Sequence, residues 1–124
     1  AMNVLPGSIA EGGSTTTVRL AGGETLRIPI ATSAALAGRP VQVGIRPEDL
    51  RLVPEPEALF QGKVAFVEQL GEIQLVHIDL GTPGLEPFIA KLPGDIDVSE
   101  GMPLSLGARA GSMHLFDDGG RAVV

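Results

Sequence analysis

Glycine and proline interrupt this chain so often that they leave little room for helices. The 124 residues include 17 glycines and 10 prolines. Few segments between them hold enough residues for three uninterrupted helical turns. Because both residue types mark turns and strand ends, the pattern favours short strands joined by turns. Hydrophobic residues make up 44% of the chain, enough for one domain with a real core.

Apolar residues that alternate with polar ones predict where the strands lie. The segments recur at about 8 to 12 residues, which is typical of a sandwich or barrel. We expect an all-β fold of about nine or ten short strands with one or two helical turns. The predicted strands are 14–20, 25–30, 41–45, 50–53, 60–70, 73–80, 88–92, 104–106, 113–116 and 121–124.

Turn residues connect several of these strands. The pair Gly22-Gly23 predicts a hairpin between 14–20 and 25–30, and Asp117-Asp118-Gly119-Gly120 predicts one between 113–116 and 121–124. Pro29 is expected on an edge, where no ladder N–H is needed. Residues 32–37 predict a helical turn capped by Thr32 or Ser33. The segment 2–13 is expected to be irregular.

The stretch 41–50 stands where the sequence becomes regular. Arg46-Pro47-Glu48-Asp49 predicts a rigid charged corner between two strands, because Pro47 fixes its own φ and keeps Arg46 extended. We expect 1–40 to form N-terminal strands and a connector and 41–124 a barrel, together one domain. The local sequence leaves two interpretations of this corner: a solvated surface ion pair or a contact surface for another domain or subunit.

One later strand carries a more detailed expectation. Within 60–70, alternation predicts one face with Val64, Phe66 and Glu68 and the other with Ala65, Val67 and Gln69. Gly62 predicts a bulge or bend there.

Composition excludes several classes of function. The net charge of −6 argues against a nucleic-acid partner, which needs a basic surface. The sequence contains no cysteine, which excludes disulfides and thiolate chemistry. It has neither a membrane-spanning apolar run nor a signal peptide at its start. The opening Ala1-Met2-Asn3 suggests an excised piece of a longer protein.

No motif indicates catalysis. Gly62-Lys63 is followed by Val64, whereas a phosphate-binding loop requires Ser or Thr there. His77 and His114 lack a second histidine at metal-ligand spacing, so we expect them to be partly exposed strand residues. No serine lies in a nucleophile elbow. We therefore expect a non-catalytic chain without a cofactor or metal of its own.

Four motifs, in order along the chain, resemble one family. They are Met2–Gly7, Val43–Glu48, Gly62–Gly71 and His114–Asp117, which reads His-Leu-Phe-Asp. They resemble the C-terminal regulatory domain of MalK/UgpC-type ABC importer ATP-binding subunits, the transport-associated OB (TOBE) domain. The resemblance covers nearly the whole chain, and it implies an OB-fold-like architecture of small β-barrels (TOBE/MOP-like).

The resemblance also implies a function. The chain would be the regulatory and dimerisation domain of a subunit that drives import of sugars or glycerol 3-phosphate-like solutes. ATP and Mg²⁺ would bind the subunit's ATPase domain, since Walker A, the ABC signature and Walker B are absent here. Implied partners are that ATPase domain, the twin subunit, the permease subunits and, in some members, a regulatory protein. The implied location is cytoplasmic, peripheral on the inner face of the membrane.

The candidate interface residues follow from the same motifs. They are Arg46, Pro47, Glu48, Glu68, Leu70, Gly71, Glu72, Phe116 and Asp117.

Two other functions stay open at this point. A small-ligand sensor for an oxyanion or metabolite would need convergent donors such as Arg46, Arg109 or Arg121. A nucleic-acid-binding OB-fold would stack bases on aromatic residues beside a basic groove. The four phenylalanines and the acidic charge disfavour the latter.

Overall fold

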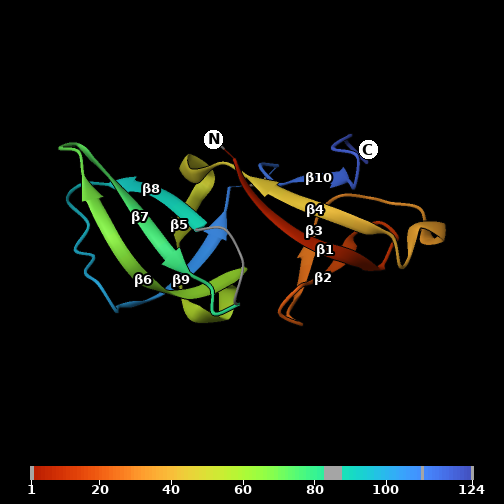
Figure 1. Ribbon diagram of the computed structural model, residues 1–124, viewed down its shortest axis with the longest axis horizontal. Coiled ribbons are helices and arrows are strands. Elements are labelled where there is room, and N and C mark those ends of the chain that lie inside the picture. Colours follow the sequence, from red (N-terminus) through yellow and green to blue (C-terminus); the bar gives the residue numbers. More distant parts are fainter. Residues whose placement is uncertain (1, 83–87, 110, 124) are drawn as a thin grey trace. The chain divides into compact units, whose positions relative to one another are not determined.

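Strands carry nearly all the regular structure of this chain (Figure 1). The computed structural model describes residues 2–82, 88–109 and 111–123. Within that part, ten strands form two five-stranded sheets, and the helical elements are three single 3₁₀ turns. The predicted all-β fold with nine or ten strands is confirmed. The chain divides into two compact units: unit 1 holds residues 1–3 and 45–112, and unit 2 holds 4–44 and 113–124.

The sheet of unit 2 has the strand order β10-β4-β1-β2-β3. Its strands are β1 (Asn3–Glu11), β2 (Thr16–Leu20), β3 (Thr25–Ile28), β4 (Pro40–Ile45) and β10 (His114–Asp117). β2 and β3 form the predicted antiparallel hairpin. β3 is an edge strand, and it ends at Ile28, so Pro29 lies just beyond its last residue. The 3₁₀ turn η1 (Ala34–Leu36) is capped by the Ser33 hydroxyl, which accepts from the Ala35 N–H.

β1 corrects the expectation that residues 2–13 are irregular. Leu5 and Ile9 alternate into the core, although Pro6 and Gly7 between them look like turn residues. Gly7 lies opposite Leu20 of β2, where a Cβ would come within 2.5 Å of the Arg19 carbonyl oxygen. The glycine thus permits close strand approach and does not mark a turn.

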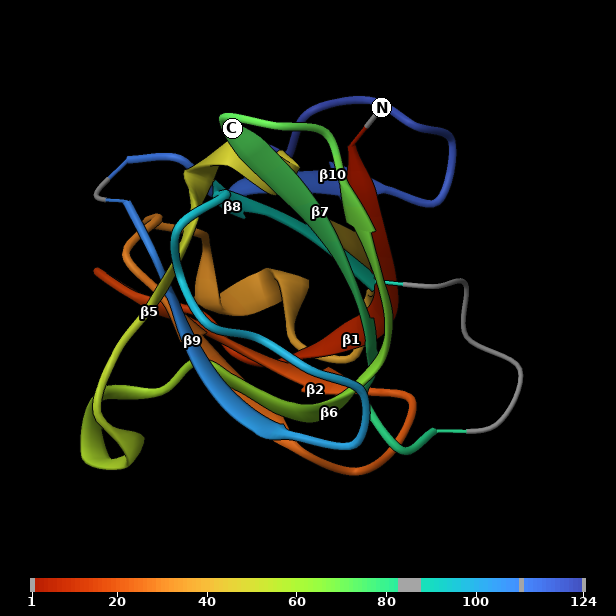
Figure 2. The ribbon, with the colours of Figure 1, turned by 90° about the vertical axis from the view of Figure 1, so that its left-hand side faces the viewer.

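The sheet of unit 1 has the order β5-β9-β6-β7-β8. Its strands are β5 (Leu50–Leu52), β6 (Phe60–Gln69), β7 (Ile73–Asp79), β8 (Phe88–Pro93) and β9 (Pro103–Ala108). Seen end-on, they run around a ring (Figure 2). The outer strands β5 and β8 approach each other, so the sheet is a nearly closed barrel. The turns η2 (Pro47–Asp49) and η3 (Glu55–Glu57) flank β5.

Both cores are mainly aliphatic. In unit 1, Phe60 and Phe88 pack with ring centroids 4.9 Å apart and rings tilted by 47°. Further buried apolar residues of unit 1 are Ile45, Leu50, Val64, Val76, Ile78, Ala90, Leu92, Leu104 and Leu106. In unit 2 they are Leu5, Ile9, Val18, Leu26, Ile28, Val41, Val43, Met113 and Leu115.

A β-bulge in β6 changes which side chains share a face. The pairing of β6 with β7 shifts between Val64 and Phe66, so Val64 is buried while Phe66 is 44% exposed. The prediction that these two share a face was therefore wrong. The register shift lies at Ala65 and not at Gly62. Gly62 instead allows close contact, since a Cβ there would lie 2.5 Å from the Asp79 carbonyl oxygen.

Each unit is built from two separate stretches of sequence. The second stretch of unit 2 contributes β10, which pairs antiparallel with β4. After β10, the chain turns back and forms a single antiparallel bridge between Phe116 and Ala122. The predicted return strand 121–124 is therefore reduced to this one bridge in the part of the chain that the structure describes. The division at residue 40 that the sequence indicates falls at the start of β4 and stays a prediction.

Candidate functional site

The charged corner after β4 folds as predicted, as a single turn between two strands. η2 begins at Pro47, and Arg46 before it is extended. Arg46 and Glu48 are exposed and Pro47 is half-buried. These three residues therefore lie on the surface of unit 1, where another domain or subunit can reach them.

Asp49, the last residue of η2, has a different role from its neighbours. It is 5% exposed, and its Oδ1 accepts from Arg109 Nη2 at 2.9 Å and Nε at 3.1 Å. The Arg109 backbone N–H also donates to the Asp49 carbonyl at 2.9 Å. Buried Ser112 donates its hydroxyl proton to the Arg109 carbonyl. The ion pair thus ties the corner to the chain that follows β9.

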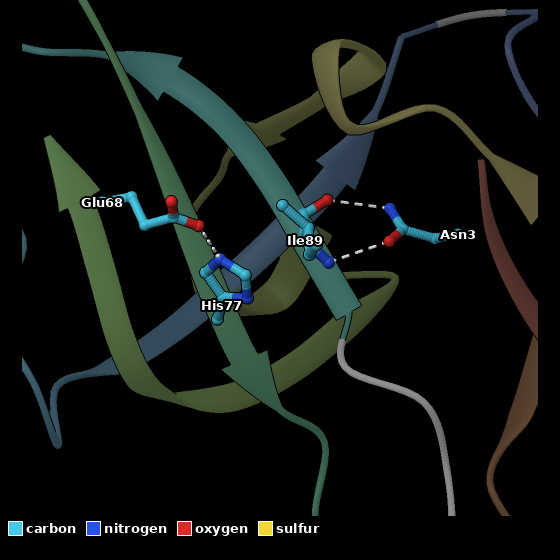
Figure 3. A network of polar contacts seen from close by, with 4 residues as sticks. All are labelled: Asn3, Glu68, His77 and Ile89. Atoms are coloured by element: carbon cyan, nitrogen blue, oxygen red, sulfur yellow. Dashed lines mark hydrogen bonds and ion pairs between the residues drawn. The ribbon is translucent and has the colours of Figure 1, made fainter. Parts of the chain in front are cut away.

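The β6–β7 hairpin presents a second group of candidate residues. Phe66 stacks on His77, with ring centroids 3.9 Å apart and planes 15° apart. His77 Nε2 lies 2.7 Å from Glu68 Oε1 (Figure 3). Glu68 is 48% exposed at its side chain and His77 13%. The two contacts fix the histidine ring against the sheet and leave the carboxylate accessible.

The end of this hairpin is also exposed. Leu70 is 56% exposed, and its N–H donates to the Ile73 carbonyl at 3.0 Å. Gly71 has a φ of +93°, a conformation that favours glycine. Glu72 beside it is exposed. Leu70, Gly71 and Glu72 therefore form a tight turn that offers one apolar and one anionic side chain.

Asn3 makes a long-range contact that the sequence does not predict. Its Nδ2 donates to the Ile89 carbonyl, and its Oδ1 accepts from the Ile89 N–H, both at 2.8 Å (Figure 3). Ile89 lies on β8, an outer strand of the unit 1 sheet. A single amide side chain therefore occupies one position of an open strand edge. No local pattern in the sequence signals this pairing.

Gln74 is the most buried polar side chain of β7, with no exposed area. Its Nε2 donates to the carbonyls of Pro93, at 2.9 Å, and Ile96, at 2.7 Å. Its Oε1 accepts from Gln69 Nε2 at 3.1 Å. Gln74 thus links β7 to the last residue of β8 and to the segment that follows it.

Phe116 and Asp117 lie in unit 2, at the end of β10. Asp117 Oδ1 accepts from the N–H groups of Gly119 and Arg121, both at 2.9 Å, which confirms the predicted turn. Phe116 is half-buried, and the centroids of its ring and the His114 ring lie 6.1 Å apart. A hollow of about 270 Å³ adjoins the turn. It is lined by Ile9, Leu36, Arg39, Pro40, Val41, Asp117, Asp118, Ala122 and Val123.

The predicted site residues thus fall into three groups. The corner and the hairpin belong to unit 1, and Phe116 and Asp117 belong to unit 2. Of the three arginines considered as ligand donors, Arg109 directs its guanidinium to Asp49. Arg46 belongs to unit 1 and Arg121 to unit 2.

The histidines lie where the sequence placed them, half-buried on β7 and β10. Across residues 2–82, 88–109 and 111–123, no three acidic or histidine side chains gather closely enough to hold a metal ion. In the same part of the chain, no helix has the length and apolar character to cross a bilayer.

Family comparisons agree with these features. The MalK OB fold domain family matches residues 1–50, and the TOBE domain family matches residues 43–116. The OB-fold expectation is therefore confirmed. Neither match is to an ATPase domain, in agreement with a non-catalytic chain.

Three relatives of this chain are ATP-binding proteins of transport systems. The chain is 41% identical to the alpha-glucoside transport ATP-binding protein AglK of Rhizobium meliloti (strain 1021), over 98% of this chain and 33% of that protein. It is 37% identical to the sn-glycerol-3-phosphate import ATP-binding protein UgpC of Jannaschia sp. (strain CCS1), over 97% and 31%. It is 35% identical to the maltose/maltodextrin import ATP-binding protein MalK of Vibrio cholerae serotype O1, over 85% and 28%.

The chain spans about a third of the length of these relatives. Among solved structures, it resembles the cytoplasmic molybdate-binding protein ModG with a TM-score of 0.73. That match covers 92% of this chain and 94% of ModG at 18% identity, so it shows a shared fold alone. The TOBE match spans more than half of the sequence. The resemblance noted in the motifs is thereby confirmed, and the chain belongs to the TOBE domain family.

Proposed function

We propose that this chain is the regulatory and dimerisation part of the ATP-binding subunit of an ABC importer. The observation that carries the proposal is the 41% identity to an alpha-glucoside transport ATP-binding protein across 98% of the chain. Relatives named for maltose and for sn-glycerol-3-phosphate import support sugars or glycerol 3-phosphate-like compounds as the transported solutes.

In this role the chain does no chemistry itself. ATP and Mg²⁺ bind the subunit's ATPase domain, and the permease subunits carry the solute. The subunit works in the cytoplasm, held at the inner face of the membrane by those permease partners. A nearly closed barrel with an aliphatic core suits this task, because it deforms little and can keep two subunits together while their ATPase domains move apart.

The exposed corner is proposed as one contact of this domain with its neighbours. Arg46 and Glu48 expose opposite charges on a turn whose backbone Pro47 restricts. Such charges set orientation more than affinity. Replacing both residues by alanine in the parent subunit is expected to leave stability nearly unchanged and to weaken dimerisation or regulation. Unchanged transport and dimerisation would remove the corner from the interface.

Two measurements test the function as a whole. The parent gene product is expected to carry a Walker A motif and an ABC signature before the residue that is Ala1 here, and their absence would overturn the proposal. Deleting residues 1–124 from the parent is expected to preserve nucleotide binding while lowering the dimer population in sedimentation velocity. An undiminished dimer would contradict the dimerisation role.

A further inference from the structure

The hollow of about 270 Å³ beside the turn after β10 lies entirely within unit 2. Three segments meet around it. β10 runs antiparallel to β4 (Figure 1), which sets Asp117 opposite Val41. β1 is tied to the residues just before β4, because the Ile9 N–H donates to the Arg39 carbonyl at 2.9 Å and the Gly38 N–H donates to the Ile9 carbonyl at 2.7 Å. Backbone hydrogen bonds therefore hold the walls of the hollow in place.

Part of the lining is aliphatic. Ile9 and Val41 are core residues, with 2% and 3% of their area exposed. Leu36 of η1 and Val123 are half-buried, and all four residues line the hollow. A ligand that rests here covers some of this apolar area, which favours a molecule with C–H groups along one face.

Three further residues of the lining are charged. Arg39 and Asp118 are exposed, and Asp117 is half-buried. Asp117 Oδ1 accepts from two backbone N–H groups of its own turn, whereas Oδ2 has no hydrogen bond to any residue that the structure describes. Within the same part of the chain, Arg39 and Asp118 form no ion pair and no side-chain hydrogen bond. One donor group and two acceptor groups are therefore available to a ligand.

This combination of side chains selects a class of ligand. Two carboxylates and one guanidinium leave one net negative charge on the lining, which opposes an anion such as a phosphate ester. The guanidinium in turn opposes a simple cation. Hydroxyl groups donate to carboxylates and also accept from a guanidinium, and they lose less hydration on binding than the charges of a zwitterion do. A neutral molecule with several hydroxyls on a compact carbon frame satisfies every group.

The size of the hollow narrows the class further. Pockets that bind drug-sized ligands have volumes of roughly 300–1,000 Å³, so about 270 Å³ suits a single sugar ring better than an oligosaccharide. We propose that this hollow binds a neutral polyol of monosaccharide size. Arg39, Asp117 and Asp118 hold its hydroxyls, and the aliphatic residues pack against its carbon frame.

The site is separate from the candidate interface residues of the corner and the β6–β7 hairpin, which belong to unit 1. It therefore adds a binding function to the proposed regulatory role. Sugars are among the solutes proposed above, so an imported sugar is one source of the ligand. Only that last step rests on the proposed function.

Saturation-transfer NMR on the 124-residue chain tests the site, because this method detects weak binding. D-Glucose is the probe, and a dissociation constant on the order of 1 mM is expected for so small a set of polar partners. L-Alanine, a zwitterion, and glycerol 3-phosphate, an anion, are expected to bind at least about tenfold more weakly.

Removal of single charges tests the polar partners. Arg39→Ala and Asp118→Ala each delete one hydrogen-bonding group and are expected to weaken glucose binding about tenfold. Arg19→Ala and Glu24→Ala remove the same charges at exposed positions of unit 2 outside the hollow. Both control variants are expected to bind glucose as the wild type does.

Filling the hollow provides a second readout. Ala122 is exposed and lines the hollow, so Ala122→Trp is expected to abolish glucose binding while the urea midpoint stays unchanged. A folded wild-type chain that binds no glucose, or binds it equally well in every variant, would overturn the proposal. Tighter binding of L-alanine or glycerol 3-phosphate would overturn it as well. The dimer population of the parent subunit is measured separately, so failure of this site leaves the dimerisation function standing.

Discussion

The side-chain amide of Asn3 pairs with both backbone polar groups of Ile89, 86 positions further along the chain. Because Ile89 lies on an outer strand of its sheet, its outward N–H and C=O groups would otherwise face solvent or another chain. Open strand edges of this kind invite unwanted pairing. Asn3, itself part of unit 1, takes the place of a neighbouring strand at that position.

Removing this amide is expected to destabilise the domain. Asn3→Ala loses two hydrogen bonds of normal length and should lower the free energy of unfolding by about 1–3 kcal/mol. Urea denaturation should show a lower midpoint with an unchanged slope. The neighbouring exposed residue Val4 provides the control, since Val4→Ala should change stability little. An Asn3→Ala variant as stable as Val4→Ala would show that the pairing is energetically neutral.

The ion pair between Asp49 and Arg109 should contribute more to the stability of the domain than a fully exposed pair does. Asp49 is 5% exposed while the Arg109 side chain is 72% exposed. Arg109→Ala leaves a buried carboxylate without its two guanidinium donors. Water screens part of the pair, so we expect a loss of about 1–2 kcal/mol by denaturant titration.

A double-mutant cycle separates this coupling from general damage. Combining Asp49→Asn with Arg109→Ala should cost less than the sum of the two single losses. Arg51→Ala, which removes an exposed arginine of β5, should be nearly silent. Strict additivity of the Asp49 and Arg109 changes would contradict a direct energetic link.

The sequence anticipates the elements of this fold better than their contacts. Period-two patterns and Gly-Gly or Asp-Gly turns are local signals, so the β2–β3 hairpin, the turn after β10 and the corner at Pro47 could be predicted. β1 was missed because Pro6 and Gly7 resemble turn residues when their partner strand is unseen. The bulge in β6 was misplaced because Gly62 is a visible signal and Ala65 is not.

The candidate site shows the same limit. The corner and the hairpin end are predicted through motifs, and the structure shows Arg46, Glu48, Leu70 and Glu72 exposed. The links Asn3 to Ile89 and Asp49 to Arg109 span 86 and 60 positions, and no periodicity relates residues so far apart. The exposure of Phe66 and Glu68 depends on the bulge in β6, which has no signal in the sequence.

Gln74 should be the polar residue that tolerates substitution least. Gln74→Leu keeps a similar volume but removes the amide donor to the Pro93 and Ile96 carbonyls, of which the Pro93 carbonyl still accepts from the Ile96 N–H at 3.3 Å. Losing two hydrogen bonds to part-buried carbonyls lowers stability, so we expect a loss of about 1–3 kcal/mol in thermal or urea unfolding. Gln69→Leu, which removes only the single bond to Gln74, should cost about 1 kcal/mol. Equal losses in Gln74→Leu and Gln69→Leu would show that water replaces Gln74 as the donor to the two carbonyls.

Gly62 should resist even the addition of one methyl group. A Cβ there would lie 2.5 Å from the Asp79 carbonyl oxygen and 2.7 Å from Ile78 Cγ2, and a backbone atom cannot rotate away as a side chain can. Gly62→Ala should therefore force β6 from β7 and cost about 1–3 kcal/mol.

Hydrogen exchange locates this effect. Amides of the β6–β7 ladder should exchange faster in Gly62→Ala, because opening that ladder becomes easier. Gly119→Ala is the matched control, since its Cβ would approach only the Asp117 carboxylate, at 3.4 Å, and it should leave stability within about 0.5 kcal/mol. If Gly62→Ala is as stable as Gly119→Ala and its ladder stays protected, then the strands have room for the methyl group. In that case the glycine is not required for their close approach.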